Sequence, residues 1–326
     1  MVNRISSEYG EIIIRDARSS DVNHFVELVI ETIDREGLES FYHFSREQMI
    51  ARFKKIESSL FPDYTVALLR NGSKTVTVGY TRLLLFPPGR AVCHFLRGPW
   101  ISSSLERTVK TRVEETLVEK TLSKSASKGI KVVKAQVPLI FESRLKLLKE
   151  DFNFKVINRL FTYTLHVTEK SSNDVPDLPV IRLFSGDEGD AERIVTLHNA
   201  CFSEDYEMTT EILSFFTKDN HIFIAEYRGS KGKAIAGMVW LEIRKIAGEI
   251  TGTVSDLVVC PRFRKKGIAT ALVLKCVEKA IEEGVLCVTA EIADTNQQSI
   301  KTFSRCGFVR DQMSGVELLE KNINFD

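Results

Sequence analysis

The stretch "RKKGIA", residues 264–269, combines three cations with a glycine and a small residue, a set suited to holding an anion. It follows the β-branched stretch 249–260 and precedes apolar residues at three- and four-residue spacing that end near Gly284. We therefore expect a turn between a strand and a helix. The first N–H groups of a helix lack partners within it and its dipole attracts negative charge, so a phosphate or pyrophosphate site is predicted here. The alternative is an ordinary solvated corner.

Carboxylates near this turn are candidate general bases. Asp256 in "VSDLVV" comes first, Glu291 in "TAEIAD" is the second candidate, and Glu249 is the third. Such a base is needed for chemistry at an amine, because an alkylamine with a pKa of ~10.4 is nearly all cationic at neutral pH. Each of the three carboxylates could instead be an exposed ion-pair partner.

Other residue types suggest no rival site. The six histidines include no H-x-x-x-H pair, so no metal site is expected. His198, beside Asn199, could face the acceptor, but a position on an exposed helix surface is the preferred interpretation. No G-x-S-x-G motif occurs, and the basic stretches lack the interleaved aromatic residues that would stack on bases. Tyr206 in "CFSEDYEM" either lines an acceptor site or is an ordinary half-buried aromatic.

The composition is that of a globular protein. The 326 residues are 43% apolar and carry a net charge of +1, which gives no bulk attraction to nucleic acid or to an anionic membrane. The N-terminal stretch lacks an apolar signal core, no run approaches the ~18 apolar residues of a membrane span, and six cysteines occur without a C-x-x-C pair. We expect a cytoplasmic monomer or homodimer with no nucleic-acid or membrane partner.

The chain divides into two similar halves. A polar stretch with two prolines, 168–179, predicts a linker between an N-terminal domain, 1–167, and a C-terminal domain, 180–326. Each half shows a strand, a helix, a hairpin, a third strand, a long helix, a strand, a short helix and a final strand pair. The pattern predicts an α/β fold with a mixed sheet that occurs twice. Two unrelated α/β domains are the alternative.

Local signals place the main elements of these halves. Hairpin turns are expected at "NGSKT", 71–75, and at "GSKGK", 229–233. Long helices are predicted over 104–122 and 269–284, each followed by a strand, at 131–137 and 286–292.

Two segments of the second half carry a family resemblance. The stretches "VCPRFRKKGIA", 259–269, and "NQQSIKTFSRCGF", 296–308, resemble the two signature segments of the GNAT superfamily of acyl-CoA-dependent N-acyltransferases. The first matches V-x-P-x-x-R-x-x-G-x-G/A, and the second matches N-x-x-A/S followed by G-F. The tandem arrangement, with "LHNACF" at 197–202, is similar to mycothiol-synthase-like double-GNAT proteins.

The resemblance implies a coenzyme site in the second half and no metal. Acetyl-CoA or coenzyme A would be bound by the strand end, the anion turn and the next helix: Leu257, Val258, Val259, Cys260, Arg264, Lys265, Lys266, Gly267, Ile268, Ala269, Thr270, Asn296, Ser299 and Phe303. Pantetheine would pair with the strand that ends at Cys260. The backbone N–H of Val259 would stabilise the oxyanion of the reaction.

Two departures from the family pattern matter. Phe303 stands where many GNAT proteins have a tyrosine, and Phe303 has no proton to give to a leaving thiolate. In the first half, "ISSSLE" at 101–106 lacks the glycine and the cations, and Phe141 and Leu148 stand where Asn296 and Phe303 would be. The first half is therefore expected to be a degenerate GNAT-like domain.

The expected function is an acetyl-CoA-dependent N-acetyltransferase that acts on an amine of a small molecule or of a protein. Because a thiol with a pKa of ~8.5 leaves readily as a thiolate, this enzyme could work without a side-chain acid. The alternative is a non-catalytic acyl-CoA-binding or regulatory module.

Overall fold

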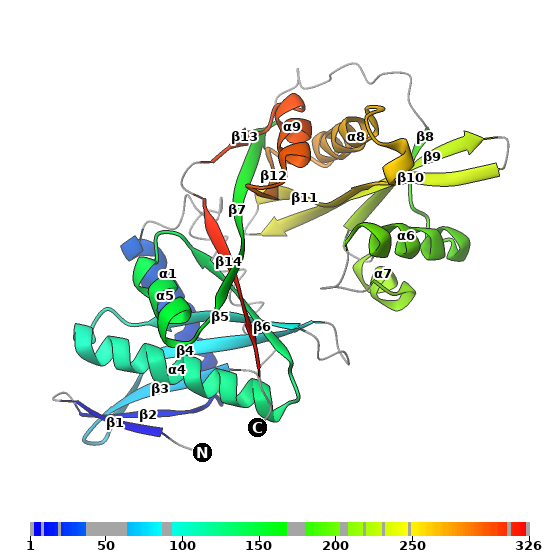
Figure 1. Cartoon of the computed structure of the whole chain (residues 1–326). Helices are drawn as coiled ribbons and strands as arrows, with labels where there is room; N and C mark the ends of the chain where they lie inside the picture. The colour runs from blue at the N-terminus through cyan, green and yellow to red at the C-terminus, as the bar shows by residue number, and fades with distance from the viewer. Residues whose placement is uncertain are drawn as a thin grey trace. The chain divides into compact units, whose positions relative to one another are not determined.

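The chain forms two compact units in a computed structural model (Figure 1). The first unit comprises Met1–Arg159 together with Met313–Asp326, and the second comprises Leu160–Gln312. The residues that the structure describes are 3–7, 10–18, 21–36, 64–86, 93–167, 180–202, 208–217, 220–229, 232–246, 249–311 and 314–323.

The first unit has a mixed sheet in the order β1-β2-β3-β4-β5-β6-β14. Its strands are β1 (Asn3–Ser7), β2 (Gly10–Asp16), β3 (Tyr64–Asn71), β4 (Lys74–Phe86), β5 (Cys93–Ile101), β6 (Val132–Pro138) and β14 (Val316–Asn322). Only β5 and β6 run parallel within this sheet, as expected for strands joined by a helical crossover. Its helices are α1 (Val22–Glu36), α4 (Arg107–Ser127) and α5 (Glu142–Lys146), which continues as the π-helical turn η3 (Leu147–Asp151).

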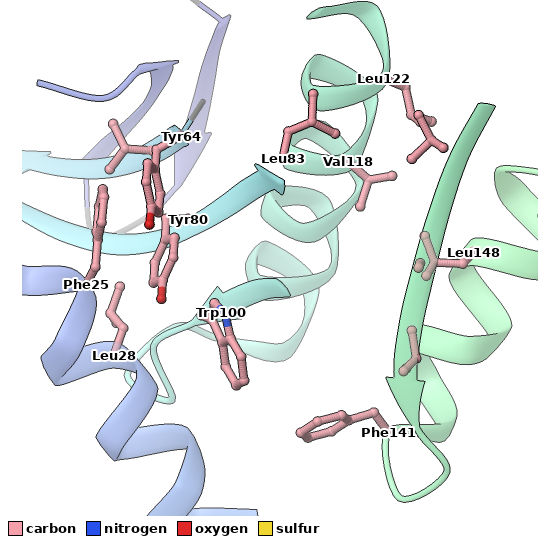
Figure 2. Close-up of a cluster of buried hydrophobic side chains, with 14 of the residues drawn as sticks. Phe25, Leu28, Tyr64, Tyr80, Leu83, Trp100, Val118, Leu122, Phe141 and Leu148 are labelled. Carbon is pink, nitrogen blue, oxygen red and sulfur yellow. The ribbon is translucent and has the colours of Figure 1, made fainter. Parts of the chain in front are cut away.

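A large aromatic cluster forms the core of the first unit (Figure 2). Phe25 of α1 stacks on Tyr64 and Tyr80, with ring centroids 5.1 and 4.3 Å away. A second cluster joins Ile12 and Ile14 of β2 to α4 residues such as Leu117. Successive strand residues thus face different helices, which follows from the two-residue period of a strand.

The second unit repeats this plan with the sheet order β7-β12-β11-β10-β9-β8, and β13 pairs with β7. Its strands are β7 (Lys155–His166), β8 (Val180–Leu183), β9 (Asn220–Gly229), β10 (Gly232–Ile246), β11 (Glu249–Val259), β12 (Cys287–Ala293) and β13 (Val309–Arg310). The helices are α6 (Glu188–Cys201), α7 (Thr210–Phe216), α8 (Ile268–Glu282) and α9 (Gln297–Arg305), with the short helix η4 (Pro261–Phe263) between β11 and α8.

Helices cover both faces of this second sheet (Figure 1). Ile194 and Leu197 of α6 pack with Met238, Trp240 and Val258 on one face. On the other face α8 packs closely, since a Cβ built on Gly237 of β10 would lie 3.1 Å from a methyl of Leu272. Burial of these apolar side chains fixes β11 between the two helix layers.

The sequence predicted these elements well. The α/β class, both hairpins, both long helices and the strands after them are confirmed, with end shifts of a few residues for the helices. The linker predicted at 168–179 lies outside the described residues. Within the described chain, no helix has the length and apolar character needed to cross a membrane.

The compact units differ from the expected domains, 1–167 and 180–326, at two strands. The part of β7 from Leu160 belongs to the second unit, where it pairs with β12. The C-terminal strand β14 belongs to the first unit, where it pairs with β6. Each half therefore supplies one strand to the other half's sheet. Local sequence patterns cannot reveal this exchange, because they indicate where a strand lies but not which strand it pairs with.

Strand register relates the two units residue by residue. The pairing of Trp100 with Tyr80 in the first unit corresponds to the pairing of Val258 with Met238 in the second. Two residues further along, the N–H of Ser102 donates to the carbonyl of Val78, and the N–H of Cys260 donates to that of Ala236. In this correspondence Gly98 matches Asp256. An Arg–Asp pair also recurs near each first helix, Arg15 with Asp21 at 2.8 Å and Arg182 with Asp190 at 2.5 Å. The repeat supports duplication of one fold and argues against two unrelated domains.

Candidate functional site

The N-terminus of α8 is shaped to receive an anion. Gly267 is its N-cap residue, with a φ of 78°, and it makes no side-chain cap. Lys265 also has a positive φ, 61°. Glycine takes this left-handed conformation without the steric cost of a Cβ. The exposed turn 264–267 therefore leads into a helix whose first N–H groups and dipole favour negative charge.

The strands β11 and β12 separate beside this turn. Their parallel pairing covers Thr251–Thr253 with Cys287–Thr289, and both strands continue for several residues beyond it. The N–H of Cys260 donates to Ala236 of β10 at 2.9 Å. Successive N–H groups of a strand point to opposite edges, so the N–H of Val259 points to the edge facing β12. An extended ligand could pair there like an added strand.

A bulge in β11 lies at the point of separation. Trp240 of β10 pairs with Ser255, and two residues later Met238 pairs with Val258, so β11 carries an extra residue. Asp256 sits in this bulge with a φ of 47°. Bulges re-aim side chains and end regular pairing, and both effects occur here next to the anion turn.

A cavity of about 540 Å³ joins these features. Eleven of the residues predicted for coenzyme binding line it: Leu257, Val258, Val259, Arg264, Lys265, Gly267, Ile268, Ala269, Thr270, Asn296 and Ser299. It is bounded by the end of β11, the start of α8 and one side of α9. Its lining combines backbone N–H groups, cations and apolar side chains, which suits a long ligand with an anionic end.

Three predicted residues do not line this cavity. Phe303 is 3% exposed and packs edge-on against Phe308, with ring centroids 5.0 Å apart, so its contact with the coenzyme stays a prediction. Its position on α9 directs its side chain into the core. Lys266 instead lies over the rings of Tyr227 and Phe263, and Cys260 packs against the core beside α6.

The cavity also includes residues that the sequence analysis missed. They are Cys201, Phe202, Phe263, Gln298, Lys301, Thr302 and Arg305. Lys301 and Arg305 are four residues apart and so share a helix face, a spacing that could have marked a second source of positive charge. Cys201 and Phe202 end α6, and only the fold brings that end to β11.

Two hydrogen bonds order the lining. The carboxamide oxygen of Asn296 accepts from the N–H of Ser299 at 3.1 Å and caps α9. The Nε of Arg264 donates to the carbonyl of Val259 at 3.0 Å, which ties the turn to the strand end. Asn296 therefore has a helix-capping role in addition to its place in the cavity.

The three base candidates have different surroundings. Asp256 is partly buried, and this burial raises the pKa of its carboxyl, while His198 acts in the opposite direction. Glu291 is exposed on β12 and does not line the cavity. The side chain of Glu249 lies outside the described residues. A carboxyl with a raised pKa next to a cavity is a functional-site candidate, so the geometry favours Asp256.

His198 corrects one expectation. We expected it on an exposed helix surface, but it is 1% exposed. It follows Ile194 by four residues and so lies on the apolar face of α6, a signal that was present in the sequence. Burial lowers the pKa of its imidazole, and the nearby Asp256 opposes that effect.

The remaining candidates add no other centre. Tyr206 lies outside the described residues, and Tyr227 is exposed on β9. Among the described residues, no group of three His, Cys, Asp or Glu side chains could hold a metal ion.

The corresponding place in the first unit is filled by its own side chains. The carboxylate of Glu31 in α1 accepts from the N–H of Ser103 at 2.5 Å, from the Ser103 hydroxyl, and from the Ser102 hydroxyl at 3.3 Å. These serines occupy the turn before α4. The guanidinium of Arg144 donates to the carbonyl of Pro99, the residue that corresponds to Leu257. An internal carboxylate thus binds the segment before α4, and an internal cation binds the residue equivalent to Leu257, which lines the cavity of the second unit.

Known structures share this architecture. A GCN5-related N-acetyltransferase from Sphaerobacter thermophilus is 16% identical and matches with a TM-score of 0.71 over 96% of both chains. A tandem GNAT protein from the clavulanic acid biosynthesis pathway is 13% identical, with a TM-score of 0.61 over 96% of this chain and 98% of its own. A GCN5-related glucosamine N-acetyltransferase region of a fungal β-N-acetylglucosaminidase is 14% identical, with a TM-score of 0.65 over 95% of this chain and 38% of that protein.

These likenesses define the fold of the chain as that of tandem GNAT proteins. At the level of sequence, the acetyltransferase (GNAT) family model matches residues 191–308, which lie in the second unit. No curated protein matches the sequence. The closer resemblance to mycothiol-synthase-like proteins stays a prediction.

Proposed function

We propose that the second unit is an acetyl-CoA-dependent N-acetyltransferase that acts on an amine of a small molecule or a peptide. The observation that carries this proposal is one cavity, bounded by a helix N-terminus that is suited to an anion and by two parallel strands that separate beside it. The match to the GNAT family model over the same residues supports it.

The lining fits the parts of coenzyme A. The N–H groups after Gly267 and the cations Arg264 and Lys265 would hold the pyrophosphate. The edge of β11 from Leu257 to Val259 would pair with the pantetheine amides, and Asn296 also lines the cavity. Lys301 and Arg305 add positive charge on α9 for the remaining phosphate oxygens.

The reaction is a direct acyl transfer, with acetyl-CoA supplying the acetyl thioester. The amine nitrogen bonds to the acetyl carbon, the carbon–sulfur bond breaks, and the proton lost by the amine passes to Asp256, directly or through water. The N–H of Val259 would donate to the oxygen that becomes negative. Glu291, exposed on β12, is the weaker base candidate.

A thiol-release assay with acetyl-CoA and a panel of amines tests the proposal. Glucosamine belongs in the panel because one structural relative is described as a glucosamine N-acetyltransferase region. Turnover that falls by about 100-fold or more in Asp256→Asn, with coenzyme A affinity retained, would support it. Full activity of this variant would rule out Asp256 as the base.

A non-catalytic acyl-CoA-binding module is the second candidate. The observation in its favour is Phe303, a buried aromatic without a proton where many family members carry a tyrosine. Tight coenzyme A binding with no thiol release across a broad amine panel would favour this candidate over the enzyme.

A further inference from the structure

We propose that Tyr227 is a positioning residue of the coenzyme site, which holds the turn 264–267 in its ligand-ready conformation by binding the side chain of Lys266. Together with Phe263, Tyr227 forms an aromatic platform on which Lys266 lies. The proposal rests on the proposed function in one respect, because coenzyme A is taken as the ligand of the turn.

The aromatic platform combines one ring from the sheet with one ring from the segment before α8. Tyr227 belongs to β9 and Phe263 to η4, and their ring centroids lie 4.9 Å apart. The Nζ atom of Lys266 lies 5.9 Å from the ring centroid of Tyr227 and 5.5 Å from that of Phe263. A cation at this distance is attracted by the electron-rich faces of the rings. The platform therefore ties the turn to the sheet.

Lys266 is the exception among the residues around the turn. All other residues of the segment 263–270 line the cavity, and Lys266 does not. Its side chain lies on the platform instead. The charge of Lys266 is thus bound by the protein itself, so its effect on a ligand would pass through the shape of the turn.

The backbone on both sides of Lys266 is in the left-handed region. Lys265 has a φ of 61° and Gly267 a φ of 78°. Glycine takes this conformation without steric cost, but a lysine keeps it only where surrounding contacts hold it. Two contacts flank Lys265: Arg264 donates to the carbonyl of Val259 at 3.0 Å, and Lys266 lies on the platform. Together they hold the conformation in which the turn borders the cavity.

The first unit has the same packing contact without the aromatic rings. Strand register places Leu69 at the position of Tyr227, and counting along the equivalent strands β5 and β11 places Leu105 at that of Phe263. Leu69 and Leu105 pack in one apolar cluster. Two leucines therefore suffice to pack this corner of the fold. The rings occur in the unit whose turn carries cations, as expected if they bind one of them.

NMR of the ligand-free protein tests the contact itself. Aromatic rings shift the signals of protons above their faces upfield, so the ε-methylene signals of Lys266 should lie upfield of those of Lys275, which pairs with Glu278 on α8. In Tyr227→Leu they should move toward the Lys275 signals, and in Tyr227→Phe they should stay. Their loss in Lys266→Met identifies them. Unchanged signals in Tyr227→Leu would overturn the proposal.

Calorimetry with coenzyme A tests the positioning role. Tyr227→Leu keeps an apolar side chain but removes the ring, so affinity should fall about fivefold, the size expected for one cation–aromatic contact at an exposed site. Tyr227→Phe keeps the ring face and should restore the affinity of the unaltered protein. Lys266→Met should lose as much as Tyr227→Leu, and the double variant should lose no more than either, because both changes remove the same contact. Lys275→Met, the control for charge, should keep full affinity.

Other roles for these residues predict other patterns. If Lys266 bound the ligand directly, Lys266→Met would weaken binding while Tyr227→Leu would leave it unchanged or strengthen it. If Tyr227 acted through packing alone, the losses in Tyr227→Leu and Lys266→Met would add. Either pattern would overturn the positioning role.

The test also separates this role from the proposed function. Absence of turnover with every amine would overturn the function and leave the test intact, because only binding is measured. If the unaltered protein bound no coenzyme A, the function and the positioning role would both be wrong. The NMR comparison would then still decide whether the platform holds Lys266.

Discussion

The turns before α8 and before α4 occupy equivalent places in the two units: the turn before α4 binds a carboxylate of the chain, and we propose that the turn before α8 binds the anionic part of a ligand. In the second unit the turn ends in Gly267 and opens onto a cavity. In the first unit the serine turn already holds the carboxylate of Glu31. The comparison teaches that the segment between the third strand and the long helix can bind a carboxylate of the chain itself in one unit and border an open cavity in the other.

The strands that lead into these two turns, β11 and β5, also differ at equivalent residues. Leu257 of β11 lines the cavity, whereas its counterpart Pro99 has no N–H, and the carbonyl of Pro99 accepts from Arg144. Arg144 also pairs with Glu114 of α4 at 3.1 Å. In the first unit, hydrogen bonds within the chain thus occupy the carbonyl at the position equivalent to Leu257.

The largest expected effect is on coenzyme binding by the open turn. Gly267→Asp puts a Cβ on a residue with a φ of 78° and a negative charge at the anion position, so affinity for coenzyme A should fall about 100-fold or more in calorimetry. Gly284→Asp is the matched control, since it has a φ of 74° and lies past the other end of α8. It should cost stability and leave affinity nearly unchanged; equal losses in both variants would refute the anion site.

The second-largest expected effect tests whether β14 stabilises the first unit. Glu317 of β14 is 2% exposed and pairs with Lys149 and Arg159 at 3.1 and 2.9 Å. Glu317→Gln should destabilise the first unit by about 2 kcal/mol, less than a fully buried pair because the two cations are partly exposed. Hydrogen exchange should show the loss in β6 and β14, with coenzyme A affinity kept. Glu320→Gln, on the same strand, is the milder control.

The pKa of Glu317 also determines how the stability of the first unit changes with pH. Burial alone would raise the pKa of Glu317, but hydrogen bonds from Lys149 and Arg159 outweigh it, so the pKa lies below its ordinary value of 4.5. The stabilisation is therefore present above pH 4.5 and is lost as the pH falls through the folded-state pKa. Glu317→Gln should remove this part of the acid sensitivity, and an unchanged acid profile would contradict the assignment.

A smaller effect tests the internal anion. Glu31→Gln removes the charge from the serine turn and should lower the stability of the first unit by about 1 kcal/mol, since Glu31 is partly exposed. Glu27→Gln, on an exposed face of the same helix, should have no measurable effect. If Glu31→Gln were neutral in thermal unfolding, the carboxylate would not be the acceptor that the turn requires.

The smallest effect concerns a single cation of the open turn. Lys265→Ala should weaken coenzyme A binding only about threefold, because exposed charges contribute little and backbone N–H groups carry most of the contact. A loss as large as that of Gly267→Asp would transfer the main role from the backbone to the side chain.

Much of the second unit could be predicted from its sequence. The strand, turn and helix from 249 to 284 follow from β-branched residues, from Pro261 and Gly267, and from apolar spacing, all of which act locally. The same is true of Asn296 as a helix cap. These features carry most of the residues that line the cavity.

The rest depends on contacts between distant segments. No local pattern shows that β14 pairs with β6, or that the end of α6 reaches the cavity. The burial of His198 was readable from its four-residue spacing to Ile194, but the place of Asp256 in a bulge is revealed only by the sheet. No local pattern links Glu31 to Ser103, which lies 72 residues further along the chain.

The stoichiometry of coenzyme A binding tests the difference between the two units most directly. Isothermal calorimetry on the full chain should give one site per chain, and Gly267→Asp should remove it. Glu31→Gln should leave this single site in place. Two sites per chain, or one site that survives Gly267→Asp, would contradict the account in which the second unit alone holds the coenzyme.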